Sequence, residues 1–158
     1  MTLLTLALVV PLATAILTYL ARGATVVQRG VSVAGGAALL IVSLVLGAEV
    51  VTTGPVAATM GGWPAPFGIT LVADLLSAAM VVITGVIGLA VAVYGLGEIT
   101  PAEERVGHHT LLHALLLGVT GAFLTGDLFN LYVWFEVMLI ASFGLLALGG
   151  RRDQLDGA

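Results

Sequence analysis

The stretch Leu128-Phe-Asn-Leu-Tyr-Val-Trp-Phe-Glu-Val-Met-Leu-Ile-Ala-Ser-Phe-Gly-Leu-Leu-Ala-Leu148 decides the fold class of this chain. At a rise of about 1.5 Å per residue, a helix of this length crosses the hydrocarbon core of a bilayer. Its single charged residue, Glu136, lies more than one turn from either end. A charged side chain at that depth costs about 2.5–3.5 kcal/mol on insertion scales. We therefore expect Glu136 to face a protein interior or a wet cavity.

The composition of the whole chain agrees with this stretch. Of 158 residues, 59% are hydrophobic and only 9% are charged, whereas soluble domains carry about 25% charged residues. The sequence therefore predicts an all-α integral membrane protein. The chain contains no cysteine. It has five basic and nine acidic residues, and the basic residues form no cluster that could bind nucleic acid. No catalytic grouping, nucleotide loop or haem pattern is present, so we expect no cofactor and no enzyme.

Five apolar runs divide the chain, and they are Leu3–Leu20, Val31–Val51, Leu71–Leu96, Leu111–Leu124 and Leu128–Leu148. Four have the roughly 17–25 residues that a membrane-spanning helix needs. The run from 111 to 124 is short and becomes a marginal span when it is extended from His109 to Thr125. With five spans the chain divides into three leading helices (1–96, with an external loop at 52–70), a cytoplasmic loop (97–110), two further helices (111–150) and a cytoplasmic tail (151–158).

The arginines give the orientation, because all five basic residues are arginine and fall into three connections. Arg22 and Arg29 follow the first span, Arg105 follows the third, and Arg151 and Arg152 follow the fifth. With five crossings these connections share one side of the membrane, and the positive-inside rule makes that side the cytoplasm. We expect the N-terminus outside and the C-terminus inside.

Two connections carry local structural signals. The external loop contains Gly61-Gly-Trp-Pro-Ala-Pro-Phe-Gly68, which is rich in turn formers and predicts a short hairpin around Gly61-Gly62. The cytoplasmic loop contains Thr100-Pro-Ala-Glu103, which is typical of a helix start. Small residues recur at helical spacing on the third and fourth spans, and we interpret them as helix-packing faces; they are Gly85, Gly88, Ala92, Gly95, Gly118, Gly121, Ala122, Thr125 and Gly126.

Candidate site residues begin with Glu136, for which we weigh a proton-carrying role against a structural hydrogen bond within the bundle. His109 and His113 share a helix face, but no third ligand has a suitable spacing, so we expect no metal site. His113 suits proton uptake from the cytoplasm, and interfacial packing is the alternative. Asn130 is a further candidate for proton translocation at the start of the fifth span. Asp127 beside it, like Asp74 on the third span, is expected to cap or turn its helix.

Two stretches carry a family resemblance: Gly61-Gly-Trp-Pro-Ala-Pro-Phe-Gly-Ile followed by Leu71-Val-Ala-Asp-Leu-Leu-Ser, and Gly121-Ala-Phe-Leu-Thr-Gly-Asp-Leu-Phe-Asn-Leu-Tyr-Val-Trp-Phe-Glu136. The chain resembles the D-type subunits of the Mrp multisubunit cation/proton antiporters. This superfamily includes the antiporter-like subunits of respiratory complex I and membrane hydrogenases.

The resemblance implies a partial antiporter-like fold. Members have about fourteen spans, with three leading helices and two inverted repeats, so 111–150 is expected to hold the first two helices of an incomplete repeat and the chain to be an N-terminal fragment. Glu136 matches a proton-relay glutamate that pairs with a lysine on a later span. The resemblance implies Na⁺/H⁺ exchange with other membrane subunits in the bilayer of a prokaryotic plasma membrane. The alternatives are a proton-pumping subunit of an NADH:quinone oxidoreductase or hydrogenase, and a non-transporting scaffold.

Overall fold

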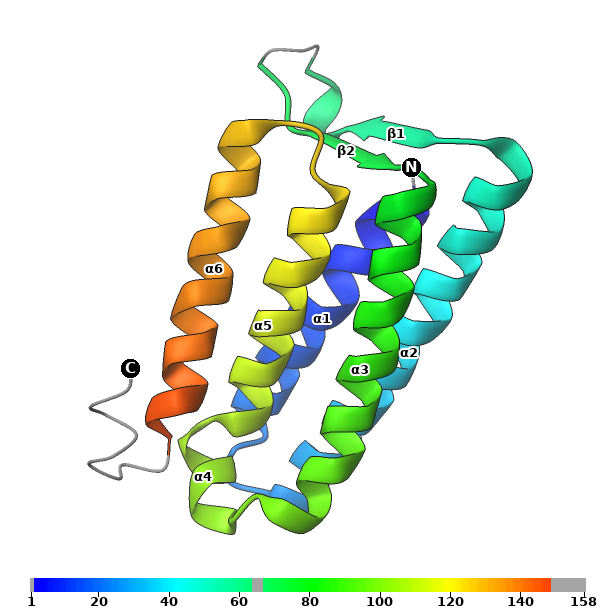
Figure 1. The fold of residues 1–158 in the computed structure, drawn as a ribbon. Coiled ribbons are helices and arrows are strands. Elements are labelled where there is room, and N and C mark those ends of the chain that lie inside the picture. Colours follow the sequence, from blue (N-terminus) through cyan, green and yellow to red (C-terminus); the bar gives the residue numbers. More distant parts are fainter. Residues whose placement is uncertain (1, 64–66, 149–158) are drawn as a thin grey trace.

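The computed structural model describes residues 2–63 and 67–148, which form a helical bundle with a hairpin at one end (Figure 1). The elements in chain order are α1 (Thr2–Leu20), α2 (Thr25–Thr53), β1 (Val56–Thr59), a 3₁₀ turn (Met60–Gly62), β2 (Thr70–Ala73), α3 (Leu75–Glu98), α4 (Pro101–Val106), α5 (His108–Leu124) and α6 (Leu128–Ala147). The expected all-α membrane fold with a short hairpin is confirmed. The expected tail at 151–158 and the prolines at 64 and 66 lie outside the described residues.

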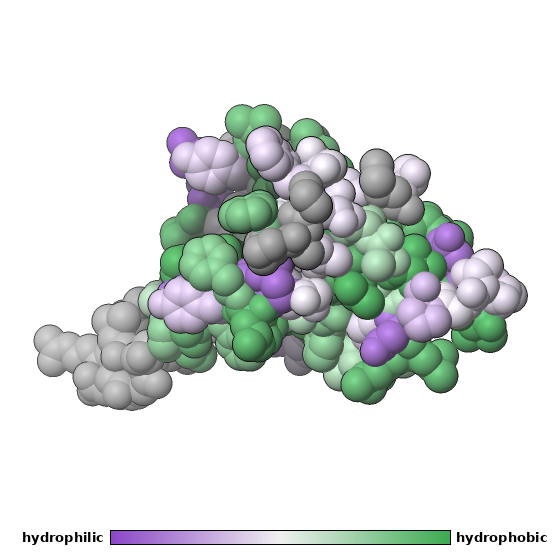
Figure 2. Space-filling view, turned by 90° about the horizontal axis from the view of Figure 1, so that it is seen from above, coloured by the Kyte–Doolittle hydropathy of each residue, from purple (hydrophilic) through white to green (hydrophobic). Residues whose placement is uncertain are grey.

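The membrane-spanning character of the helices follows from their length and composition. Helices α1, α2, α3 and α6 are long and apolar enough to cross a bilayer, whereas α5 has 17 residues. This α5 is the short fourth run of the sequence, and it packs against α1, α3 and α6 within the bundle (Figure 1). Seen from the hairpin end, scattered polar residues sit on a largely apolar body (Figure 2).

The predicted start of the third helix at Leu71 is wrong. Residues 71–73 belong to β2, which pairs antiparallel with β1, so that Leu71 lies opposite Ala58. The helix begins after Asp74, whose carboxylate accepts a hydrogen bond of 2.8 Å from the Ser77 amide, while the Ser77 hydroxyl accepts one from the Asp74 amide. This capping box sets the boundary because it satisfies amides that have no partner within the helix.

The predicted start of the second helix at Val31 is also wrong, since α2 begins at Thr25. The first turns of α2 carry Gln28 and Arg29, whose polar side chains favoured a connection in the sequence. Polar side chains can lie within these first turns because residues of α1, α4 and α5 form hydrogen bonds with them. Because Arg29 is part of the helix, its side chain projects in a defined direction, toward Glu104.

The hairpin confirms the turn expected at Gly61-Gly62. Both glycines have positive φ angles, 69° and 72°, a region that side chains with a Cβ rarely adopt. The Met60 amide donates a 2.8 Å hydrogen bond to the Ile69 carbonyl across the loop. The helix start predicted at Thr100 is confirmed as well, because Thr100 and Glu103 form a capping box with Pro101 in the first turn of α4.

Close helix packing occurs at the predicted small-residue faces. A Cβ on Gly118 would lie 2.7 Å from the Met138 side chain, and one on Gly121 would overlap the Trp134 ring. These contacts seat α6 on α5, and α6 lies at the edge of the bundle (Figure 1). A Cβ on Gly85 would likewise come within 2.9 Å of Leu40 on α2. Small residues thus set the spacing of α2, α3, α5 and α6.

Candidate functional site

Glu136 lies in the middle of α6, on the side of that helix that points away from α5. Trp134 and Met138 face α5, and each is two residues from Glu136, which corresponds to a rotation of about 200°. The Tyr132 hydroxyl, one turn earlier on the same side, interacts with the Glu136 carboxylate. The same side carries Ile140, which is 68% exposed.

Glu136 is half-buried, and the protein interior or wet cavity expected around it stays a prediction. The described residues do not enclose its carboxylate in a protein interior, and no ion pair to it occurs among them. An ionised group at mid-membrane depth without a partner carries a large cost.

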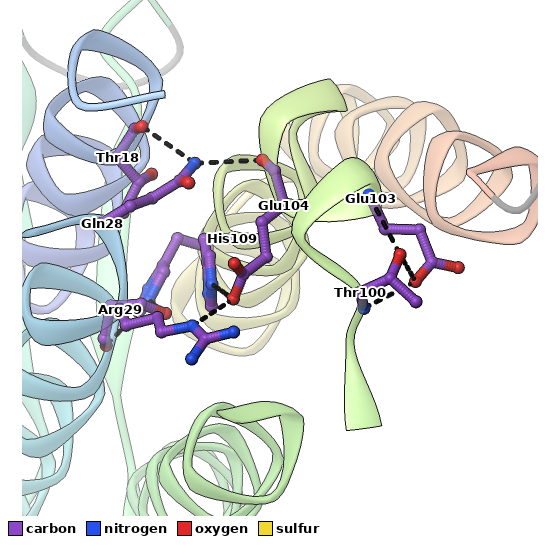
Figure 3. A network of polar contacts seen from close by, with 9 residues as sticks. Thr18, Gln28, Arg29, Thr100, Glu103, Glu104 and His109 are labelled. Carbon is purple, nitrogen blue, oxygen red and sulfur yellow. Dashed lines mark hydrogen bonds and ion pairs between the residues drawn. The ribbon is translucent and has the colours of Figure 1, made fainter. Parts of the chain in front are cut away.

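A second polar group is enclosed at the α4 end of the bundle (Figure 3). Glu104 of α4 has no exposed surface, although it lies in a connection. Its Oε1 accepts hydrogen bonds from Arg29 Nε at 2.6 Å and from His109 Nε2 at 3.2 Å. Gln28 donates to the Glu104 carbonyl and to the Thr18 carbonyl, each at 3.2 Å. We call Thr18, Gln28, Arg29, Glu104 and His109 the buried polar cluster.

The charge state of Glu104 follows from these contacts. Burial by itself raises the pKa of this carboxyl, because it removes water from the charged form. The hydrogen bonds from Arg29 and His109 and the positive charge of Arg29 outweigh burial and hold the pKa below its ordinary value of 4.5. Glu104 is therefore ionised at neutral pH and forms a buried ion pair with Arg29.

His113 lies one turn deeper on α5 than His109 and has no exposed surface. Its Nε2 lies 3.0 Å from the Ser32 carbonyl oxygen and 3.1 Å from the Ser32 hydroxyl. The structure thus fixes the ring against α2, on the side of α5 opposite α6. Although His109 and His113 share this face, the described residues contain no group of three metal-ligating side chains.

Asn130 takes part in the start of α6. Its amide donates a 2.6 Å hydrogen bond to the Asp127 carboxylate, which is the expected cap, and its side chain donates a 2.9 Å hydrogen bond to the Thr125 hydroxyl. Asn130 is nearly fully buried and lies more than one turn from Glu136. The structure does not bring His113, Asn130 and Glu136 together into one site.

Sequence reasoning missed Glu104, Arg29, Gln28 and Ser32. One signal was present: Gln28 and Ser32 are spaced i, i+4 in the first turns of an otherwise apolar helix. Polar residues on one helix face near a membrane-spanning segment indicate a buried partner. Their partner Glu104 belongs to a connection, where an acidic residue gives no sequence signal of burial.

Comparison with known proteins was made on sequence and on structure. No family model matches the sequence. The chain is 41% identical over 150 residues to the D subunit of a Na⁺/H⁺ antiporter of Bacillus subtilis, covering 95% of this chain and 30% of the relative. It is 44% identical over 128 residues to the equivalent subunit of Alkalihalophilus pseudofirmus, covering 81% of this chain and 26% of the relative.

Two solved structures share the fold. A chain of the Mrp complex from a Dietzia species superposes with a TM-score of 0.81 at 28% identity, covering 91% of this chain and 26% of that chain. A chain of the membrane-bound sulfane sulfur reductase, an archaeal respiratory membrane complex, superposes with a TM-score of 0.92 at 24% identity, covering 99% of this chain and 32% of that chain. The second likeness shows the fold alone. The chain spans less than a third of the length of each relative.

Proposed function

Over the stretch that it matches, this chain belongs to the family of Mrp-type antiporter D subunits, and from that premise we propose that it is a component of a multisubunit Na⁺/H⁺ antiporter. Within it, Glu136 acts as the proton-relay carboxylate. The observation that carries the proposal is the place of Glu136 in mid-α6, on a side that no described residue encloses. An ionised side chain at this depth is costly unless it is paired. The side of α6 that carries Glu136 faces away from α5, so a partner can approach it there.

The relay follows from the two influences on such a carboxylate. A low-dielectric surrounding favours the neutral, protonated form, and a nearby cation favours the charged form. When a lysine of a later helix moves toward or away from Glu136, the carboxylate releases or binds a proton.

Two further residues have assigned roles in this proposal. His113 passes protons near the cytoplasmic end of α5, where its ring lies one turn from His109 on the same helix face. Asn130 supplies a polar side chain near the outer end of α6, held by Thr125. In this proposal the protein lies in the plasma membrane of a bacterium and assembles with other membrane subunits. The complex exchanges Na⁺ for H⁺. The named relatives are antiporter subunits, which favours this function over the respiratory alternative.

The test is antiport by the assembled complex in inside-out membrane vesicles, with Glu136→Gln compared with the wild type. We expect Na⁺-driven proton movement to fall by about 10²-fold or more, as loss of a proton-transfer group does, while the complex assembles normally. The matched control is Glu49→Gln near the outer end of α2, which should transport normally. Normal antiport by Glu136→Gln would contradict the proposal, and failed assembly would favour the scaffold alternative.

A further inference from the structure

The protonation pattern of the two buried histidines on α5 follows from their partners. His109 Nε2 lies 3.2 Å from Oε1 of the ionised Glu104, which can only accept. His113 Nε2 lies 3.0 Å from the Ser32 carbonyl oxygen, which also can only accept. When these rings are neutral, each therefore carries its proton on Nε2. In each ring Nδ1 is then a bare lone pair.

These lone pairs belong to a set of unpartnered buried atoms. Among the described residues, seven buried side-chain atoms have no hydrogen-bond partner. Four of them are Nδ1 of His109, Nδ1 of His113, Oε2 of Glu104 and Oε1 of Gln28, and the others are Nε2 of His108, Oγ1 of Thr120 and Nε1 of Trp134. Gln28 uses its Nε2 to donate to two carbonyls, so its Oε1 is an acceptor as well. All four atoms are acceptors. Buried polar atoms normally have a partner, so these acceptors can take hydrogen bonds from water or bind a proton.

The charges around the acceptors select the species. Arg29 already neutralises Glu104 at 2.6 Å, so a metal cation would meet a guanidinium at the same carboxylate. Two of the four acceptors are imidazole nitrogens, which bind protons better than they bind hard cations. The other titratable groups beside Glu104 and His109 are His108, whose ring lies edge-on to His109 at 5.3 Å, and Glu103 of α4, whose charge acts on His108.

We propose that His109, Glu104 and Arg29 form a proton-release site at the cytoplasmic end of α5. A proton binds to Nδ1 of His109, and the imidazolium passes its Nε2 proton to Oε1 of Glu104. The N–H bond breaks, the O–H bond forms, and Glu104 then loses the proton to water. The ring, left with Nδ1–H, returns to the Nε2–H form when Nδ1 gives up its proton and Nε2 takes one back, both by way of water that reaches the cluster beside the partly exposed Arg29 side chain.

The surroundings of the site fit release rather than storage. The Arg29 side chain is 35% exposed, while Glu104 and His109 are fully buried, so the path from His109 to water leads past Arg29. Arg29 also favours the charged carboxylate, which returns the site to its starting state. This inference rests on the proposed function and deepens it, because protons that the antiporter brings in need a cytoplasmic exit. The site is separate from Glu136, since α5 and its packing against α6 lie between them.

The first test is an infrared titration of the complete protein, assembled with its partners in native membranes. We expect a pH-dependent imidazole signal that His109→Gln removes and Glu104→Gln alters. Glu98→Gln is the matched control, because it removes an exposed carboxylate at the same end of the bundle. A wild-type signal that His109→Gln leaves unchanged would overturn the proposal. This readout does not depend on antiport, so it stands even if the proposed function fails.

The second test is antiport by Glu104→Gln in inside-out vesicles, corrected for the amount of assembled complex. We expect the rate to fall by about 10²-fold, the size of a lost acid–base group, while Glu98→Gln keeps the wild-type rate. A wild-type rate in Glu104→Gln would overturn the release role. If Glu104→Gln does not assemble, Glu104→Asp and His109→Gln replace it, with the same expectation of loss for His109→Gln.

Discussion

The buried polar cluster and the outer side of α6, which is the side that faces away from α5, each contain one carboxylate, and the surroundings of the two carboxylates are opposite. Glu104 comes from a connection, and neighbours on α2 and α5 enclose it completely and supply an arginine at 2.6 Å. Glu136 comes from the middle of an apolar helix, and only Tyr132 of the same helix contacts its carboxylate among the described residues. Helix α6 is also the least buried of the long helices, with 11% of its most apolar stretch buried, against 33–39% in α1, α2 and α3.

The difference teaches that burial of a charge depends on which elements pack around it, and not on its place in the sequence. The carboxylate of the polar cluster has its cation within this part of the protein, because four elements meet there. The outer side of α6 is incomplete, because the main packing partner of that helix is α5, on its other side. We therefore expect changes in the cluster to affect folding first, and changes at Glu136 to affect transport.

The largest expected effect on stability comes from Arg29→Ala. It leaves the ionised, fully buried Glu104 without its cation, and breaking a buried ion pair costs about 3–5 kcal/mol. Because Arg29 is partly exposed, we expect a loss at the lower end, about 3 kcal/mol, measured by unfolding in mixed detergent. The matched control is Arg22→Ala, whose guanidinium lies over the Tyr19 ring on an exposed surface and should change stability by less than about 0.5 kcal/mol. Equal effects of the two variants would contradict the account of the cluster.

Acid should weaken the cluster in a defined direction. The pKa of Glu104 is lower in the folded state than its ordinary value of 4.5, so its contribution to stability is fully present above that value. It is lost as the pH falls through the lowered folded-state pKa. Unfolding measured from neutral pH downward should show this loss, and Glu104→Gln should reduce the acid sensitivity. Identical pH dependence of the variant and the wild type would contradict it.

A smaller effect is expected where α6 packs on α5. The added methyl group of Gly121→Ala would overlap the Trp134 ring, and overpacking costs about 1–3 kcal/mol. The control is Gly30→Ala on α2, where nothing lies within 4 Å of the added Cβ, so alanine should stabilise the helix by up to about 1 kcal/mol. Unfolding of both variants measures the difference. Destabilisation by Gly30→Ala as large as that by Gly121→Ala would show that the α5–α6 contact is not special.

The smallest effect is expected at the start of α6. Asp127 accepts the Asn130 amide at 2.6 Å, and loss of such a cap costs about 1 kcal/mol. We expect Asp127→Ala to lower the free energy of unfolding by this amount, and Asp127→Asn to lower it less, because asparagine caps nearly as well. A larger loss with asparagine than with alanine would rule out the capping role.

The sequence was sufficient for the fold because hydrophobic length and loop chemistry are local properties. The apolar runs, the glycine turn at Gly61 and the capping box at Thr100 were all predicted correctly. Two helix starts were wrong: residues 71–73 are as apolar as the helix that follows them, and the polar first turns of α2 have the composition of a loop. Both boundaries depend on partners that are distant in the sequence.

The candidate site was less predictable for the same reason. Glu136 stood out because a charge inside an apolar run is visible in one segment, and His113 because it lies near the start of such a run. Glu104, which is fully buried, could not be distinguished in the sequence from the partly exposed Glu103 beside it. The choice between the two depends on the direction of α4 and on Arg29 and His109, which the fold supplies.

The most direct test asks what covers the outer side of α6 around Glu136. A benzophenone amino acid placed at Phe143, two turns from Glu136 on the same side, is activated by light in the assembled complex, and the products are mapped by mass spectrometry. We predict cross-links to a helix outside the described residues that carries a lysine, while the same probe at Met138 should cross-link to α5. Products with lipid alone at Phe143 would contradict the claim that Glu136 shares its face with a protein partner.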